Sequence, residues 1–215
     1  MLCNYVDAQH EDLVLMDKET LLSNNTFLYL HHFTERKSAM RSLRKAYLEI
    51  TNVCNLSCNF CPGTRREKSF LSPHQFRTLA NKIRPHTEYL YLHLMGEPLL
   101  HPQLKGFLAI AGELGFKVII TTNGTLLNKR GEEILAAGVH KVNLSLHSFE
   151  NGADDAHGRY VGELADFAKR AADQGTIVVF RLWNKGFDHG KNQVAYDLLK
   201  EKIPANHGKL KNTGN

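Results

Sequence analysis

From Ala46 onward the sequence alternates short apolar segments with amphipathic ones, and this alternation is the strongest constraint on the fold. The apolar segments are rich in Val, Ile, Leu, Tyr and Thr, as strands are. Strands that alternate with helices predict an α/β fold with a parallel sheet, joined by right-handed crossovers. The five expected strands are 47–51, 89–94, 117–122, 141–146 and 176–182.

The ends of the intervening helices carry recognisable signals. Ser72, Pro73 and Gln75 match an N-cap, a proline at the first helical position and a capping-box glutamine. Asn128 is expected to cap a later helix, and a weaker last helix is expected at about 192–202. Glycines are placed to end three of the helices: Gly115, Gly138 and Gly175.

Residues alternate in polarity along two of the strands, which predicts a face packed on helices and a face lining a lumen. Leu90, Leu92 and Leu94 oppose Tyr89, Tyr91 and His93, and the strand at 141–146 repeats the pattern with Asn143 and Ser145 on its polar side. In parallel α/β folds, ligands bind at the carboxyl ends of the strands. Functional residues are therefore expected just after each strand.

Composition sets broad limits on function. The net charge of +5 and the pI of about 9.0 come from basic residues spread along the chain. This distribution favours a solvated surface over a nucleic-acid patch. No apolar run is long enough to span a bilayer, and the first residues lack the pattern of a signal peptide. A cytoplasmic protein without a membrane partner is expected.

Three of the four cysteines lie within eight residues, directly after the first expected strand. Cys54, Cys58 and Cys61 have the spacing C-x3-C-x2-C, which in a reducing compartment favours metal binding over disulfides. Three thiolates can hold one corner region of an iron–sulfur cluster and leave one iron open to a small ligand. Two alternatives remain open at this point: a zinc site completed by a histidine, and a ferredoxin-like site completed by Cys3.

The three-cysteine loop, with the aromatic Phe60 directly before Cys61, resembles the signature of the radical S-adenosylmethionine superfamily. The resemblance covers about residues 46–184. It implies a partial (βα) TIM-like barrel of about five βα units, a 4Fe–4S cluster and S-adenosylmethionine as cofactors. In such enzymes the reduced cluster donates one electron to the cofactor's sulfonium, and the resulting 5′-deoxyadenosyl radical takes a hydrogen atom from the substrate. A flavodoxin- or ferredoxin-type reductant is implied as well.

The resemblance also assigns roles to residues after the second and third strands. Met95-Gly96-Glu97-Pro98 is similar to the family's G-G-E-P element, which holds the amino group of the cofactor's methionine part. Met95 replaces the first glycine of that element. Asn123 lies in a T-N-G turn that the family often has. Gly96, Glu97, Pro98 and Asn123 are therefore candidate cofactor-binding residues.

Further candidates follow the fourth and fifth strands. Ser145 is expected to contact the ribose or carboxylate of the cofactor, and Arg181 either meets the cofactor carboxylate or forms a structural ion pair. Asn184, at a strand end, is another candidate contact. Phe60 is expected to pack on the adenine.

The expected domain organisation is an extension at 1–45, a radical core at 46–203 and a polar tail at 204–215. The motifs are most similar to members with a cysteine-rich (SPASM-type) extension, which often modify peptides or proteins. Because no cysteine follows Cys61, that extension is absent, and the chain is expected to be truncated with an open sheet edge beside 176–182. The alternative is that 26–30 adds a strand. A non-catalytic iron–sulfur or electron-transfer module is the alternative function.

Overall fold

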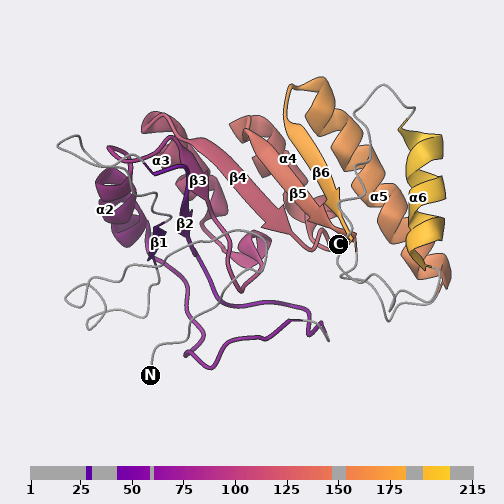
Figure 1. The fold of residues 1–215 in the computed structure, drawn as a ribbon, viewed down its shortest axis with the longest axis horizontal. Coiled ribbons are helices and arrows are strands. Elements are labelled where there is room, and N and C mark those ends of the chain that lie inside the picture. Colours follow the sequence, from indigo (N-terminus) through magenta and orange to yellow (C-terminus); the bar gives the residue numbers. More distant parts are fainter. Residues whose placement is uncertain (1–27, 31–42, 59–60, 147–153, 183–190, 204–215) are drawn as a thin grey trace.

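A computed structural model describes residues 28–30, 43–58, 61–146, 154–182 and 191–203 (Figure 1). Strands and helices alternate along the chain from β2 onward, as the sequence pattern predicts. The elements are β1 (Leu28–Leu30), β2 (Ala46–Leu48), α2 (Pro73–Ile83), β3 (Tyr89–Tyr91), the 3-10 helix η1 (Pro98–Leu100), α3 (Leu104–Glu113), β4 (Lys117–Thr122), α4 (Leu127–Ala137), β5 (Lys141–Ser145), α5 (Asp154–Asp173), β6 (Ile177–Arg181) and α6 (Lys191–Lys202).

The strands form one sheet in chain order, from β1 at one edge to β6 at the other. Neighbouring strands from β2 to β6 are parallel, whereas β1 pairs antiparallel with β2. The expected α/β fold with five parallel strands is confirmed. All five parallel strands therefore end at the same edge of the sheet, where the cysteine loop begins.

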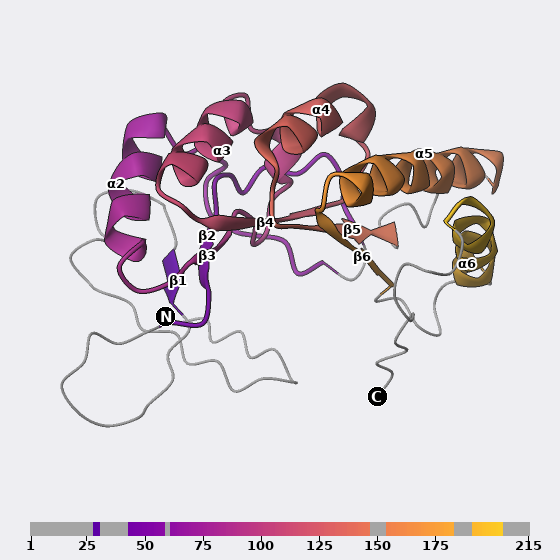
Figure 2. The ribbon, with the colours of Figure 1, turned by 90° about the horizontal axis from the view of Figure 1, so that it is seen from above.

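Helices α2 to α5 lie along one side of the sheet (Figure 2). The hydrophobic core is between these helices and the sheet, with Leu90, Leu92 and Ile120 fully buried on the sheet side. Phe76 of α2 and Phe107 of α3 stack with ring centroids 4.5 Å apart. The residues that alternate with these along the strands consequently lie on the opposite face.

Local signals set several of the helix ends. Ser72 and Gln75 form the expected capping box of α2, and Gly138 ends α4 in the left-handed conformation at φ 57°. The expected cap at Asn128 is wrong. Helix α4 already begins at Leu127, and its N-cap is Leu126 without a side-chain hydrogen bond. Asn128 is thus inside the first turn.

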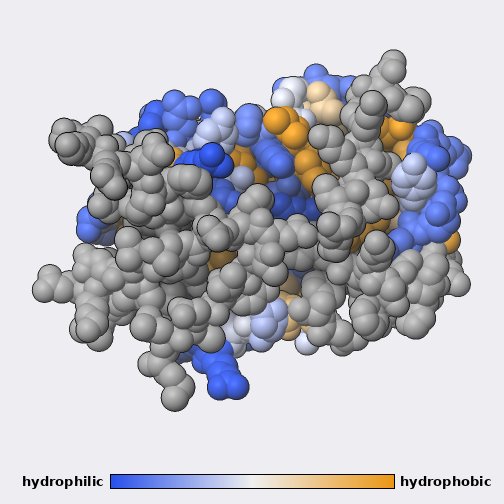
Figure 3. All heavy atoms as spheres, viewed as in Figure 1, coloured by the Kyte–Doolittle hydropathy of each residue, from blue (hydrophilic) through white to orange (hydrophobic). Residues whose placement is uncertain are grey.

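The last helix, α6, packs on α5 mainly through Ala195 and Leu199, which are both buried. Hydrophilic residues gather over α6 on the face seen in Figure 3. Lys202 also joins the two helices, because its Nζ lies 2.9 Å from a carboxylate oxygen of Asp166. Within the described residues, no helix combines the length and the apolar character needed to cross a membrane.

The two edges of the sheet test the expectation of an open edge beside 176–182 and its alternative, an added strand at 26–30. Leu28–Leu30 adds a strand within the predicted segment 26–30, but it joins beside β2 and not beside β6. Within the described residues, β6 therefore has a strand partner on one side only. The division into 1–45, 46–203 and 204–215 stays a prediction.

Candidate functional site

The cysteine loop leaves the carboxyl end of β2 and exposes its sulfur atoms to different degrees. Cys54 and Cys58 are half-buried, whereas Cys61 is exposed. The N–H of Cys61 donates to the carbonyl of Cys58 at 3.0 Å, which ties these two cysteines together. The N–H of Gly63 lies 3.4 Å from the Sγ of Cys61. Such N–H···S contacts stabilise a negatively charged sulfur.

The two ends of this loop are held together beside β2. Thr51 donates through Oγ1 to the carbonyl of Ser69 at 2.9 Å, and it forms a β-bridge with Phe70. The side chain of Asn52 donates to the carbonyl of Glu67 and accepts from the N–H of Ser69, each at 2.8 Å. The segment between is therefore a closed loop whose base is fixed on the sheet.

Gly96 brings the end of β3 into contact with the base of the cysteine loop. A Cβ at this position would lie 2.3 Å from the carbonyl oxygen of Thr51 and 2.9 Å from backbone atoms of Asn52. One residue later, the N–H of Glu97 donates to the carbonyl of Val53 at 2.8 Å. The close approach thus requires glycine and places this backbone next to Cys54.

Met95 stands where the related motif has its first glycine, and its backbone has a different partner. Its N–H donates to Oε1 of the buried Glu49 at 3.0 Å. The other oxygen of Glu49 lies 2.6 Å from Nη1 of Arg66, which returns from the cysteine loop. The substitution therefore leaves the close approach at Gly96 intact.

The carboxylate of Glu97 is almost fully buried, at 2% exposed, and it has three donors. Oε1 accepts from Thr122 Oγ1 at 2.7 Å and from the N–H of Leu99 at 3.0 Å, and Oε2 accepts from the N–H of Asn123 at 2.7 Å. Burial raises the pKa of Glu97, and the three donors oppose that rise. The carboxylate thereby fastens the end of β4 to η1, whose first residue is the buried Pro98.

Asn123 connects the end of β4 to the cysteine loop. Its Nδ2 donates to Asn55 Oδ1 at 2.9 Å and lies 3.9 Å from the Sγ of Cys54. Its Oδ1 accepts from both the N–H and the hydroxyl of Thr125. Both ends of this amide are therefore in use, and they fix the position of Cys54.

Tyr160 of α5 ties the ends of β4 and β5 together. Its hydroxyl lies 2.6 Å from the carbonyl oxygen of Asn123 and 3.1 Å from that of Ser145. Burial raises the pKa of Tyr160, so the phenol stays protonated and donates. Ser145 is opposite Arg181 in the β5–β6 register, and both side chains are half-buried.

The structure therefore brings most of the expected site residues to one edge of the sheet. Gly96, Glu97, Pro98 and Asn123 surround the base of the cysteine loop, while Ser145 and Arg181 follow on β5 and β6. Three residues named from the sequence lie outside the described part of the chain: Phe60, Asn184 and Cys3.

Some contributors to this site carry no clear sequence signal. Tyr160 belongs to the apolar stripe of its helix, and nothing in the sequence marks its hydroxyl. Asn55 lies within the cysteine motif, and this position is its only sequence signal for a role in the site. Glu49 could have been noticed as an acid inside an apolar strand.

The cysteine loop fits an iron–sulfur cluster by its chemistry. Three thiols on one loop are soft donors suited to iron, and two of the three accept N–H groups. Within the described residues, no set of three His, Cys, Asp or Glu side chains converges on a single ion. Burial raises the pKa of the Cys54 thiol, so the metal would have to displace its proton.

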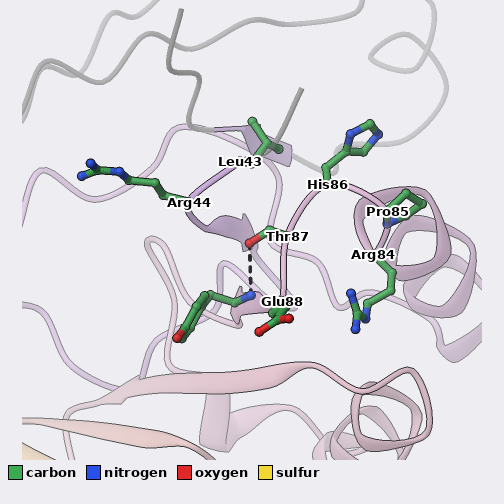
Figure 4. A pocket seen from close by; sticks show the side chains of 8 residues that line it. Leu43, Arg44, Arg84, Pro85, His86, Thr87 and Glu88 are labelled. Carbon is green, nitrogen blue, oxygen red and sulfur yellow. Dashed lines mark hydrogen bonds between the residues drawn. The ribbon is translucent and has the colours of Figure 1, made fainter. Parts of the chain in front are cut away.

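A hollow at the opposite end of the strands is separate from this site (Figure 4). It is lined by Leu43, Arg44, Arg84, Pro85, His86, Thr87, Glu88 and Tyr89. Thr87 accepts a hydrogen bond from the N–H of Tyr89, and Glu88 pairs with Lys117 at 3.0 Å. Among the described residues, neither the three motif cysteines nor the residues at the carboxyl ends of the strands line it.

A family model and several curated relatives match the chain. The model of the Radical SAM superfamily matches residues 48–184. A probable GTP 3′,8-cyclase of Sulfurisphaera tokodaii is 34% identical over 114 residues, which are 51% of this chain and 36% of that protein. The GTP 3′,8-cyclase of Aquifex aeolicus is 32% identical over 120 residues, again 36% of its length. The chain thus spans about a third of these relatives.

Solved structures show the same fold. Streptococcus suis SuiB bound to S-adenosylmethionine superposes with a TM-score of 0.53 at 20% identity, covering 72% of this chain and 37% of SuiB. SuiB bound to its precursor peptide SuiA gives the same TM-score at 19% identity, covering 36% of that chain.

Proposed function

Because the chain belongs to the Radical SAM superfamily, whose enzymes use a 4Fe–4S cluster and S-adenosylmethionine, we propose that it binds both and cleaves S-adenosylmethionine reductively. The observation that carries this proposal is the placement of the cysteine loop. The loop leaves one parallel strand and is fastened to the ends of two others through Gly96 and Asn123. When bound, the two cofactors supply one-electron cleavage of a carbon–sulfur bond and a hydrogen-abstracting radical.

Cys54, Cys58 and Cys61 are the proposed ligands of the cluster. The printed contacts of the Cys54 and Cys61 sulfur atoms are with the side-chain amide of Asn123 and the backbone N–H of Gly63. The N–H of Gly63 and the amide of Asn123 direct positive dipole ends at Cys61 and Cys54. The Asn123 amide opposes the burial that raises the pKa of the Cys54 thiol, and cluster binding requires the deprotonated sulfur.

The contacts made by the proposed cofactor-binding residues favour different roles for them. Gly96 supports the backbone approach, because its lack of a Cβ keeps β3 against the cysteine loop. For Glu97 and Asn123, the existing hydrogen bonds favour a role in positioning that backbone. Ser145 and Arg181 lie at neighbouring strand ends, where the ribose and carboxylate of the cofactor are proposed to bind. Pro98, Phe60 and Asn184 keep their sequence-based assignments as proposals.

The sequence motifs favour a peptide or protein as the substrate of the proposed reaction. They also imply a flavodoxin- or ferredoxin-type reductant, and the sequence favours a cytoplasmic location for the protein. The similarity to GTP 3′,8-cyclases favours a small molecule instead. A non-catalytic iron–sulfur module remains the second candidate, since the chain spans only about a third of those relatives.

Anaerobic reconstitution tests the cluster. We expect about four irons per chain, and we expect Cys54→Ala, Cys58→Ala and Cys61→Ala each to abolish the cluster absorbance. Cys3→Ala is the matched control and should keep it. A loss in Cys3→Ala equal to the other three would show that the ligand set is wrong.

Reduction in the presence of S-adenosylmethionine tests the chemistry. We expect 5′-deoxyadenosine from the wild-type protein and none from the three cysteine variants. A protein that holds the full cluster and binds S-adenosylmethionine but forms no 5′-deoxyadenosine would be the non-catalytic module.

A further inference from the structure

Among the described residues, two buried side-chain polar atoms lack a hydrogen-bond partner: Oδ1 of Asn143 and Nδ1 of His93. Asn143 lies on β5, and its side chain is completely buried, at 0% exposed. Buried polar atoms are normally satisfied, and an exception in a native structure points to a water, an ion or a ligand that binds there. The oxygen of Asn143 is therefore evidence for a bound group beside β5.

The other end of the same amide is fixed in place. Nδ2 of Asn143 donates to Oγ1 of Thr121 at 3.0 Å, and the two residues are register partners on β5 and β4. Asn123, two residues after Thr121, differs because both ends of its amide have partners. The Asn143 side chain is thus oriented by one end and keeps an acceptor at the other, as a preorganised binding group does.

Alternation along β5 places this oxygen below the proposed cofactor contact at Ser145. Residues two apart on a strand share a face and lie about 6.6 Å apart along it. Asn143 is therefore on the face of Ser145 and one step further from the carboxyl end of the sheet. The two heavy atoms of a hydrogen bond lie within about 3.2 Å of each other. A group bound to Asn143 consequently lies deeper than a group held by Ser145, which favours the substrate over the cofactor.

His93, which follows β3, is on the same face and carries the second unpartnered atom. Its ring centroid lies 5.8 Å from that of Tyr91, two residues earlier in the chain. Tyr91 is opposite Ile119 in the register, and Ile119 shares its face with Thr121, the partner of Asn143. Polar atoms without partners thus lie on both sides of β4, which supports a polar ligand on this face.

The chemistry beside the Asn143 oxygen selects a neutral hydrogen-bond donor. An amide oxygen accepts hydrogen bonds and cannot donate one, so its partner is an N–H or an O–H group. Lys141 lies two residues before Asn143 on the same face and is half-buried. A cationic ligand group at this oxygen would be repelled by the positive charge of that lysine. A hydroxyl or an amide N–H is therefore favoured.

We propose that Asn143 is a substrate-binding residue, whose Oδ1 accepts a hydrogen bond from a neutral hydroxyl or amide N–H of the substrate. The proposal rests on the proposed function, because it names the substrate chemistry of the same site. Such an acceptor gives specificity, since a molecule without the donor leaves the buried oxygen unpaired.

Binding of small probes to the reconstituted protein, followed by ligand-observed NMR, tests the proposal. Benzyl alcohol carries the hydroxyl and benzamide the amide N–H, whereas benzyl methyl ether and N,N-dimethylbenzamide are their counterparts without a donor. S-adenosylmethionine is present in excess, so that the cofactor's own contacts are occupied. We expect one donor probe or both to bind about threefold to tenfold more tightly than the counterpart, the usual range for a neutral hydrogen bond. The pair with the larger difference identifies the donor as a hydroxyl or an amide.

Matched variants locate the acceptor. Asn143→Leu has nearly the same shape without polar atoms and should abolish the difference within each pair of probes. Asn143→Ala removes the same oxygen and repeats the test if the leucine variant does not fold. Asn143→Asp keeps an acceptor oxygen and should keep the preference for the donor probe. Asn128→Leu makes the same change at an exposed position of α4 and should leave the preference as in wild type.

Three results would overturn the proposal. Donor probes that bind no more tightly than their counterparts would show that water alone occupies the oxygen. An unchanged difference in the leucine and alanine variants would place donor recognition elsewhere. A difference seen only before S-adenosylmethionine is added would assign the oxygen to the cofactor.

Formation of 5′-deoxyadenosine by the wild-type protein is measured separately, so that the two proposals fail in different ways. Cleavage without donor recognition would refute the assignment of Asn143 alone. Donor recognition without cleavage would refute the proposed function and leave a binding site for a neutral donor.

Discussion

Replacing Gly96 by alanine should destabilise the protein and disturb the cysteine loop together. The added Cβ would lie 2.3 Å from the carbonyl oxygen of Thr51, whereas a carbon normally approaches such an oxygen to about 3.3–3.6 Å. The overlap is therefore about 1 Å, and it involves backbone atoms that cannot rotate away. Thr51 and Asn52 are also the residues that hold the base of the loop.

The expected cost follows from this geometry. Overpacked sites lose about 1–3 kcal/mol, and we expect about 3 kcal/mol here because both contacts are with backbone. For a chain of this size each kcal/mol lowers the melting temperature by about 2–4 °C, so Gly96→Ala should melt roughly 6–12 °C below wild type. The same displacement should reduce the iron bound per chain after reconstitution.

The assay compares thermal unfolding and iron content of reconstituted Gly96→Ala with a matched variant, Gly106→Ala. Gly106 lies inside α3, and a Cβ there would meet nothing within 4 Å. Alanine in a helix interior is better than glycine by about 0.5–1 kcal/mol, so this control should be slightly more stable than wild type. The reasoning fails if Gly96→Ala keeps both the wild-type melting temperature and its full iron content.

Three further variants test buried side chains. Burial lowers the pKa of His101 from 6.5 to about 4, so the free energy of unfolding should fall as pH drops from about 6.5 towards 4, by up to about 1.4 kcal/mol per pH unit. Urea titrations at pH 7 and pH 5 should show a smaller loss of unfolding free energy between the two pH values for His101→Gln than for wild type. An equal loss in both proteins would contradict this. Tyr160→Phe should cost about 1–3 kcal/mol, since the buried carbonyl of Asn123 loses its hydroxyl donor; urea denaturation showing no loss would mean that water replaces the hydroxyl. Glu97→Gln keeps the shape but cannot accept from all three donors, so it should lose about 1–3 kcal/mol and some iron, whereas Glu113→Gln on the exposed surface should change neither.

The fold could be predicted largely because its signals are local. The capping box at Ser72 and Gln75, and Gly138 in its left-handed conformation, act within a few residues of the elements they delimit. The prediction failed at Asn128, where α4 begins one residue earlier without a side-chain cap. There the tertiary structure outweighed a weak local preference.

The site was predicted less completely, because its residue types were visible but their partners were not. Glu97 was assigned to the cofactor from its motif, yet the sequence does not show that Thr122 and Asn123 would reach its carboxylate from another strand. The hydroxyl of Tyr160 likewise finds its acceptors only after α5 folds back over the sheet. Long-range hydrogen bonds of this kind leave no periodic trace in a sequence.

The antiparallel strand β1 limits how the sheet can close on itself. Because β2 already has β1 on one side and β3 on the other, a strand added beyond β6 could never pair with β2. It could meet only β1, whose direction is reversed. An all-parallel ring that includes the described strands is thus ruled out by pairing alone, and any closure of this sheet would keep the antiparallel pair of β1 and β2 in its wall.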